Sequence, residues 1–273
     1  TKRRGYRLPV LVAQQPAIYV FDDFATPEEC HSIWADGVGI LRDAATMNPQ
    51  GKSVPSDDAR SGFSGTLQAD RWSPRTADVV RRMDAITMMP HSHGQYLQLS
   101  AYQKRDRYEL HTDSSVQVGR QLTALLFLND VEGGGGELAF PWADGVRNWT
   151  TPLGEEGAPP PGVHGTGRPA DETQGWRSLP KLDSEWVCNR TSNALRVEPR
   201  IGRLVVFNNH DQMGRMLKPY SLHGSCPVKD QSQGVKRIAQ RWYQWFPLHG
   251  KNLLGSLLEQ VGLSKDWKVP SSV

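Results

Sequence analysis

The N-terminal part of the chain combines one strand pattern with two helix patterns. Residues 17–24 (AIYVFDDF) form a largely apolar run that predicts a strand. In residues 26–37 (TPEECHSIWADG), Thr26 stands at the N-cap, Pro27 opens the first turn and Gly37 closes the segment. These end signals predict a short helix.

A second helix is predicted over residues 73–89, with Ser73 as N-cap and Pro74 at the first helical position. Its apolar positions at helical spacing are Val79, Val80, Met83 and Ile86 or Thr87. Between the two helices, residues 48–65 are rich in Gly, Ser, Pro and Asp. This composition predicts a long loop with room for a short hairpin.

From about residue 95 the apolar positions alternate instead of following helical spacing, and Leu97, Leu99 and Ala101 share one face. The segments that predict strands are 95–103, 121–130, 201–209 and 236–246. The four glycines 133–136 predict a tight turn. Two helices followed by strands with no helix between them favour an antiparallel sandwich or barrel braced by helices.

The region 142–187 interrupts the strand pattern, since its central part is rich in Pro and Gly and has little periodicity. A loop of this length in a compact domain is either functional or without regular structure. We therefore predict one domain over residues 1–273. It comprises helical support and a loop in 1–94, a β core in 95–247 that carries the insertion, and a C-terminal tail in 248–273.

Composition changes this picture little. A chain of 273 residues suits one large domain or a domain with insertions. The net charge of +3 comes from scattered basic residues and gives no reason to expect a nucleic-acid partner; the terminal run TKRR is interpreted as a solvated arm. No apolar stretch approaches membrane-spanning length. Acceptor sequons at Asn148 and Asn189 point to the endoplasmic reticulum or the secretory pathway.

The stretch YELHTDSS, residues 108–115, holds the first candidate chemistry. Side chains two residues apart on an extended chain point to the same face, so His111 and Asp113 can hold one metal ion or form an ordinary hydrogen-bonded pair. Alone, the pair favours the ordinary interpretation, because a His-x-acid triplet is expected about once by chance in a chain of this composition.

His223, in the stretch SLHGSCPV, supplies a third ligand. It is far enough from His111 to lie on a different strand that faces the same interior. Two imidazoles and one carboxylate form the facial triad of non-haem Fe(II) oxygenases, which leaves coordination positions open. A 2-oxo acid and O2 would occupy those positions.

Lys236 completes the candidate site. Strand parity places Lys236, Ile238, Gln240 and Trp242 on one face, so the lysine is predicted to point into the interior. An unpaired buried ammonium is costly. The far carboxylate of a bound 2-oxo diacid would serve as its partner.

Five stretches of the chain resemble the catalytic domain of the prolyl 4-hydroxylases of the algal and plant type. They are YELHTDSS, LTALLFLNDVEGGGGELAFP, VEPRIGRLVVFNN, SLHGSCPV and KRIAQRW. The resemblance runs in order from about residue 17 to residue 247. It implies a mainly β fold, a double-stranded β-helix (jelly roll, cupin-like), with the N-terminal helices packed on the larger sheet. It also implies that His111, Asp113 and His223 bind Fe(II) and that Lys236 pairs with the distal carboxylate of 2-oxoglutarate.

Further residues are assigned by the same resemblance. Tyr102 matches a tyrosine that contacts the cosubstrate, and Thr123 occupies a position that lines the cosubstrate pocket. Trp242 keeps the family spacing from Lys236 and is expected to form a wall of that pocket. Arg60, in DARSGFSG, lies in a segment similar to the mobile loop that covers the peptide, which makes it the candidate substrate contact.

The expected activity is hydroxylation of peptidyl proline at C4, dependent on Fe(II), 2-oxoglutarate and O2, with succinate and CO2 as co-products and ascorbate as reductant. A fold does not fix a substrate. One alternative is the same chemistry on a free amino acid or a small metabolite. Another is a non-catalytic jelly-roll binding module, although the presence of all three ligands and the lysine favours an enzyme.

The chain departs from the family pattern in three places. The turn KDQSQGV before Lys236 is longer, the 142–187 insertion is long, and HTDSS carries small polar residues where the family often has an aromatic one. These differences leave the metal chemistry intact and bear on the substrate. The cysteines follow the family, and the resemblance implies a Cys188–Cys226 disulfide with Cys30 free.

Overall fold

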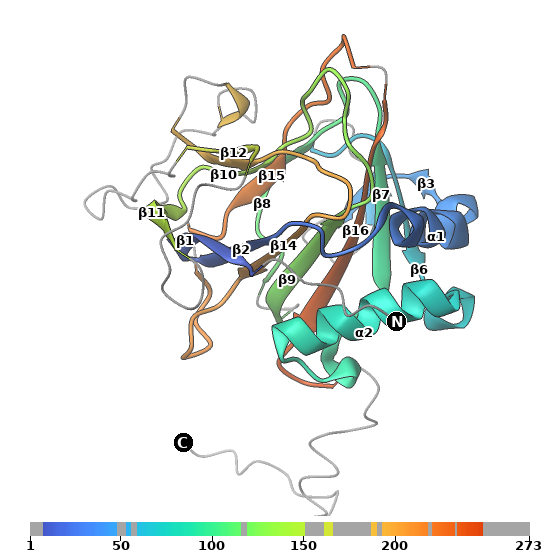
Figure 1. Ribbon diagram of the computed structural model, residues 1–273, viewed down its shortest axis with the longest axis horizontal. Coiled ribbons are helices and arrows are strands. Elements are labelled where there is room, and N and C mark those ends of the chain that lie inside the picture. The colour runs from blue at the N-terminus through green and yellow to red at the C-terminus, as the bar shows by residue number, and fades with distance from the viewer. Residues whose placement is uncertain are drawn as a thin grey trace, which may run out of the picture.

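The structure is a computed structural model, which describes residues 8–47, 53–55, 59–115, 119–150, 161–165, 187–189, 193–217, 220–232 and 234–247. Two β-sheets enclose a core, and two helices cover the outer face of the larger sheet (Figure 1). This arrangement confirms the predicted jelly roll braced by N-terminal helices.

The larger sheet has nine strands among the described residues, in the order β11 (Asp144–Thr150), β1 (Val10–Gln15), β2 (Ala17–Phe21), β14 (Leu204–Asn208), β9 (Arg120–Phe127), β16 (Lys236–Gln244), β7 (Leu97–Tyr102), β6 (Phe63–Leu67) and β3 (Arg42–Asp43). The smaller sheet has the order β12 (Val163–His164), β13 (Leu195–Val197), β10 (Leu138–Phe140), β15 (His223–Ser225) and β8 (Tyr108–His111). A separate hairpin pairs β4 (Ala45–Met47) with β5 (Ser53–Pro55).

Both predicted helices form, and their caps explain where they begin. Helix α1 (Pro27–Gly37) carries a capping box, in which Thr26 Oγ1 accepts from the Glu29 amide at 3.1 Å and the Glu29 carboxylate accepts from the Thr26 amide at 2.8 Å. Helix α2 (Pro74–Thr87) begins after Ser73, whose side chain accepts from an amide in the first turn. Among the described residues, neither helix is long and apolar enough to span a bilayer.

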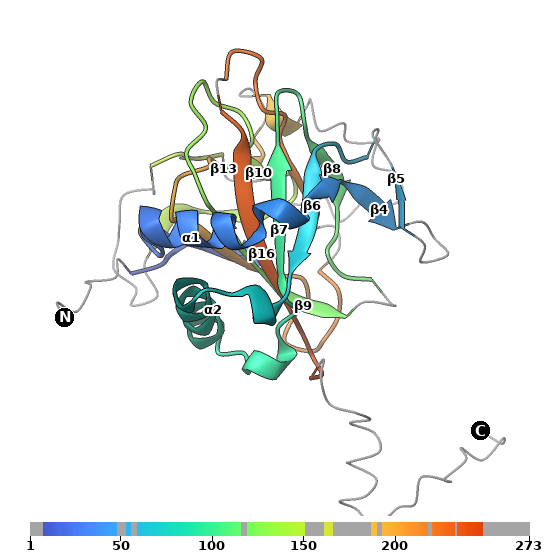
Figure 2. The same ribbon diagram turned by 90° about the vertical axis from the view of Figure 1, so that its right-hand side faces the viewer.

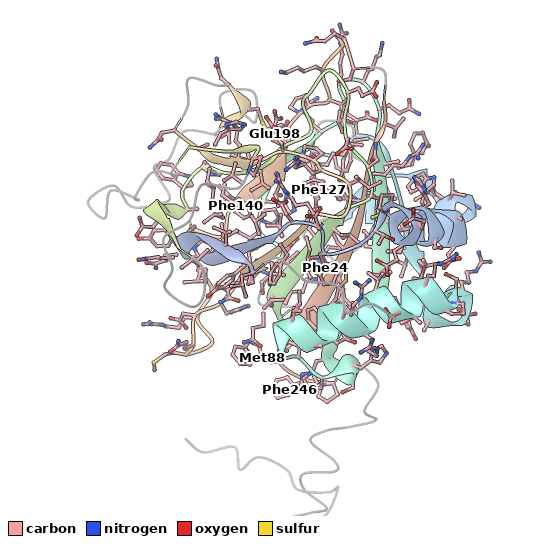
Figure 3. All side chains as sticks on the ribbon, viewed as in Figure 1. Phe24, Met88, Phe127, Phe140, Glu198 and Phe246 are labelled. Atoms are coloured by element: carbon pink, nitrogen blue, oxygen red, sulfur yellow. A yellow bond between two sulfur atoms is a disulfide. The ribbon has the colours of Figure 1, made fainter. Side chains whose placement is uncertain are left out.

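The apolar stripes of the helices pack on one face of the larger sheet, as Figure 2 shows from the helix side. Ile33 of α1 and Met83 of α2 are fully buried against this face. The opposite, inner face of the larger sheet and the smaller sheet enclose a second core, which contains Phe127 and Phe140 (Figure 3). The candidate site lies beside this second core, since the Phe140 ring centroid is 5.6 Å from that of His223.

Several strands lie outside the segments predicted as strands, and β1, β11 and β6 are three of them. β1 precedes the predicted strand and pairs with it, and β11 lies in the insertion and pairs with β1. β6 lies in the region predicted as loop and pairs with β7. The expectation of a loop was therefore wrong for 63–65 and for the start of 142–187, because pairing with an available strand edge orders segments that have no alternating pattern. Much of the rest of that insertion lies outside the described residues.

The predicted Cys188–Cys226 disulfide is present, and Cys30 is free and buried. The disulfide joins the segment before β13 to the residue that follows β15. Cys226 also packs with Ala139 and Ala194 in a small apolar cluster.

Replacing both Cys188 and Cys226 with serine is expected to lower the free energy of unfolding by about 2–4 kcal/mol, since the bridge closes a loop of 38 residues in the unfolded chain. Urea unfolding of the native protein and the double variant measures this loss. Thiol counting by mass spectrometry of the unreduced protein is the control: one free thiol is expected, and three would contradict the pairing.

Candidate metal centre

Strand pairing in the smaller sheet brings the two predicted histidine ligands together. β8 and β15 are antiparallel, and His111 and His223 are direct cross-strand partners. Asp113 lies in a bend just beyond the end of β8. Its carboxylate oxygens are 3.5 Å from Nε2 of His111 and 3.5 Å from Nε2 of His223. One ligand atom from each residue lies within 4.8 Å of the others, a set able to hold one metal ion.

Backbone carbonyls fix the orientation of both imidazoles. Nδ1 of His111 lies 2.8 Å from the Glu109 carbonyl oxygen, and Nδ1 of His223 lies 2.9 Å from that of Ser221. Donation from Nδ1 to a carbonyl leaves Nε2 as the unprotonated nitrogen. Metal-binding histidines usually have their rings oriented by a hydrogen bond of this kind. The Nε2 atom of His223 is buried without a hydrogen-bond partner, as expected for an atom that binds a metal ion.

Asp113 is held as a carboxylate. The Thr123 hydroxyl donates to its Oδ2 atom at 2.7 Å and accepts from the Asn209 amide at 3.0 Å. Burial acts to raise the pKa of Asp113, but the nearby His223, His111 and Arg120 side chains outweigh it and hold the pKa well below its usual value. Thr123 lies on the opposite sheet, so this contact ties the ligand to the larger sheet.

His223 stays neutral in the ligand-free protein. Burial and the His111 side chain lower the pKa of His223 to about 4, although Asp113 opposes the shift. The site therefore offers two imidazole nitrogens and one carboxylate from neighbouring positions. This donor set matches the facial triad that binds Fe(II) and leaves positions open.

Lys236 points into the interior, as strand parity predicted. It is 1% exposed, and its ammonium donates to Ser225 Oγ at 2.6 Å. Burial lowers its pKa to about 7, and the Glu137 carboxylate opposes this shift. A buried ammonium whose hydrogen-bond partner is a neutral hydroxyl suits the carboxylate of a bound anion.

The larger sheet places two other predicted residues beside these groups. Tyr102 is the cross-strand partner of Lys236, and its ring centroid is 5.1 Å from Nζ of that lysine. Trp242 is the cross-strand partner of Thr123. The contacts that Tyr102, Thr123 and Trp242 make with a cosubstrate stay predictions, while the Thr123–Asp113 bond is a role that the sequence did not indicate.

Arg60 lies inside the site. It is 9% exposed, donates to Ser100 Oγ at 2.8 Å and has a buried Nε atom without a partner. Burial acts to lower its pKa, but the neighbouring tyrosines Tyr102 and Tyr108, with Asp113, raise it overall. Whether it contacts substrate stays a prediction.

Arg120 lies near the candidate ligand Asp113, and the sequence did not indicate it as a site residue. Its guanidinium carbon lies 3.7 Å from the centroid of the Trp242 ring, and it donates to Gln95 Oε1 at 3.1 Å. Burial lowers the pKa of Arg120, while Asp113 and Tyr108 raise it. A basic residue immediately before the predicted strand 121–130 was the available signal.

The chain is similar in sequence to known proteins over most of its length. A family model described as "2OG-Fe(II) oxygenase superfamily" matches residues 97–244, which include the three candidate metal ligands and Lys236. Prolyl 4-hydroxylase 2 of Arabidopsis thaliana is 27% identical over 239 residues, covering 85% of this chain and 68% of that protein. Probable prolyl 4-hydroxylase 6 of the same plant is 28% identical over 235 residues, covering 83% and 68%.

One solved structure shares the fold at low identity. It is a prolyl hydroxylase in complex with a hypoxia inducible factor oxygen degradation domain peptide fragment from Trichoplax adhaerens. The TM-score is 0.50 at 12% identity, with 86% of this chain and 87% of the other covered. This likeness concerns the arrangement of strands and helices.

Proposed function

The chain belongs to the 2OG-Fe(II) oxygenase superfamily, and from this premise we propose that it hydroxylates a prolyl residue of a peptide at C4. The observation that carries the proposal is the convergence of His111, Asp113 and His223 in one cluster, with Lys236 buried behind it. The similarity to plant prolyl 4-hydroxylases over most of the chain supports the choice of substrate.

The residues of the site have distinct parts in this reaction. His111 and His223 would present Nε2, and Asp113 its carboxylate, to Fe(II). Lys236 would pair with the distal carboxylate of 2-oxoglutarate, next to Ser225 and Tyr102. When bound, Fe(II) with 2-oxoglutarate and O2 supplies the oxidation of an unactivated C–H bond, with release of succinate and CO2. Thr123 and Asn209 keep the carboxylate of Asp113 oriented.

The test is succinate release from 2-oxoglutarate with Fe(II) and ascorbate, which we propose as the reductant. A proline-rich peptide should stimulate release and gain the mass of one oxygen, whereas the same peptide with alanine in place of proline should do neither. Stimulation by free proline or another small metabolite, but not by peptide, would assign the site to a small substrate. No turnover under any condition would indicate a binding module.

The affinity for 2-oxoglutarate is expected to fall as the pH rises above about 7. The pKa of Lys236 in the ligand-free protein is about 7, so below this pH the ammonium is already charged. Above it, binding the carboxylate requires uptake of a proton, and affinity falls by up to about tenfold per pH unit. Calorimetric titration on both sides of pH 7 measures this slope. Lys236→Arg, which keeps its charge, is the control, and a flat native profile would contradict the shift.

We further propose that the protein matures in the secretory pathway. The Cys188–Cys226 disulfide suits an oxidising compartment, and the sequon residue Asn189 is exposed directly after it. Expression in a eukaryotic host should give a protein that shifts in mobility on treatment with an N-glycosidase, and Asn189→Gln should reduce that shift. A native protein with free thiols and no glycan would contradict this localisation.

A further inference from the structure

A chain of contacts leads from Arg60 to the metal ligand His111. The imidazole of His111 is stacked on the Tyr108 ring, with centroids 3.7 Å apart and an angle of 18° between the planes. The guanidinium carbon of Arg60 lies over the same tyrosine ring, 4.6 Å from its centroid. Tyr108 therefore contacts a ligand of the candidate metal centre and a buried cation at once.

Backbone hydrogen bonds join the segment that carries Arg60 to the strand that carries Tyr108 and His111. Residues 59–61 run along β8, where the Ala59 carbonyl accepts from the Glu109 amide at 2.8 Å and the Arg107 carbonyl accepts from the Ser61 amide at 3.1 Å. The carbonyl of Glu109 is in turn the acceptor for Nδ1 of His111. Segment 59–61 thus holds the residue whose carbonyl orients the imidazole.

Arg60 is anchored from the other sheet. Its Nη2 atom donates to Ser100 Oγ on β7, whereas Tyr108 belongs to β8 of the smaller sheet. Immediately after this segment, β6 pairs with β7 along its whole length. A change in the position of segment 59–61 therefore reaches His111 by two routes, the stacked rings and the Glu109 carbonyl.

We propose that Tyr108 is a positioning residue for His111, and that it couples segment 59–61, through Arg60, to the metal centre. The inference rests on the proposed function only in taking the His111, Asp113 and His223 cluster as a metal site. Tyr108 acts by its ring, because the ring makes both contacts. Because stacking restricts the imidazole to the orientation that presents Nε2 to the ion, loss of the ring weakens metal binding.

The test uses Co(II), an air-stable substitute for Fe(II), with binding measured by calorimetry and ligand orientation by the Co(II) absorption spectrum. Tyr108→Leu should raise the dissociation constant about three- to tenfold and change the spectrum. Tyr108→Phe, which keeps the ring, should stay within about twofold of the native value. Arg60→Met should raise the constant about two- to fivefold.

The double variant tests the coupling. If Arg60 acts through Tyr108, Arg60→Met has no further effect in the Tyr108→Leu background, whereas independent effects multiply and would overturn the coupling. Arg107→Met is the matched control, because Arg107 lies on the chain beside Tyr108 and pairs with Glu109 outside the stack. Its Co(II) affinity should equal that of the native protein.

Three further outcomes are decisive. An unchanged Co(II) constant and spectrum in a folded Tyr108→Leu protein would overturn the positioning role. If Tyr108→Leu does not fold, as thermal unfolding would show, an unchanged constant in Arg60→Met would overturn the coupling. A native protein that binds no Co(II) would instead refute the metal centre, and with it the proposed function.

Discussion

Replacing Asp113 with alanine is expected to lower metal affinity by at least about 100-fold and so to abolish turnover. Mutating a residue that only orients a metal ligand already lowers metal affinity by about 10- to 100-fold. Asp113 supplies the only carboxylate of the ligand set, and its oxygens lie 3.5 Å from Nε2 of His111 and 3.5 Å from Nε2 of His223. Without it the two imidazoles remain, and these do not make up the triad.

Calorimetric titration with Fe(II) under anaerobic conditions measures the Asp113→Ala effect, and succinate release follows turnover. Asp230→Ala is the matched control, since Asp230 forms an exposed ion pair with Arg105. Such pairs contribute little to stability. Metal affinity of Asp113→Ala within twofold of the native value would show that the cluster does not hold the ion.

Replacing Lys236 with methionine is expected to raise the KM for 2-oxoglutarate by about 30-fold or more, because removing one partner of a buried charge pair costs at least about 2 kcal/mol. The same change should raise the unfolding midpoint of the ligand-free protein. The native ammonium is buried with Ser225 Oγ as its hydrogen-bond partner, and an apolar side chain of similar length removes that desolvation cost.

Thermal unfolding with and without 2-oxoglutarate separates these two effects. At the same concentration, the ligand should stabilise Lys236→Met less than the native protein, since stabilisation by a ligand falls as its dissociation constant rises. Lys104→Met, at an exposed lysine, is the control for loss of charge. Equal stabilisation of native protein and Lys236→Met by 2-oxoglutarate would place the distal carboxylate elsewhere.

Local signals in the sequence predicted much of the framework. The N-cap residues Thr26 and Ser73, each followed by proline, marked where the helices begin, because capping depends on neighbours within one turn. Strand parity predicted that Lys236 points inward, since the period of a strand is two. Each of these predictions needed only residues that are close in the sequence.

Contacts between distant segments could not be predicted in this way. The bond from Thr123 to Asp113 joins two sheets, and the position of Arg120 over Trp242 depends on how β9 pairs with β16. Asp113 itself reaches the site from a bend beyond β8, whereas the prediction assumed an extended chain through it. These neighbours depend on which strands pair, and the residue pattern of one strand alone does not indicate its partner.

The disulfide lies close to the metal centre along the chain, since Cys226 directly follows the strand that begins with His223. The enzyme therefore has two opposed redox needs within a few residues: a ferrous ion that must be kept reduced and a bridge that must stay oxidised. A thiol reagent keeps the iron reduced but can also reduce the disulfide. A non-thiol electron donor serves both, so assays in dithiothreitol are expected to underestimate the activity of the intact protein.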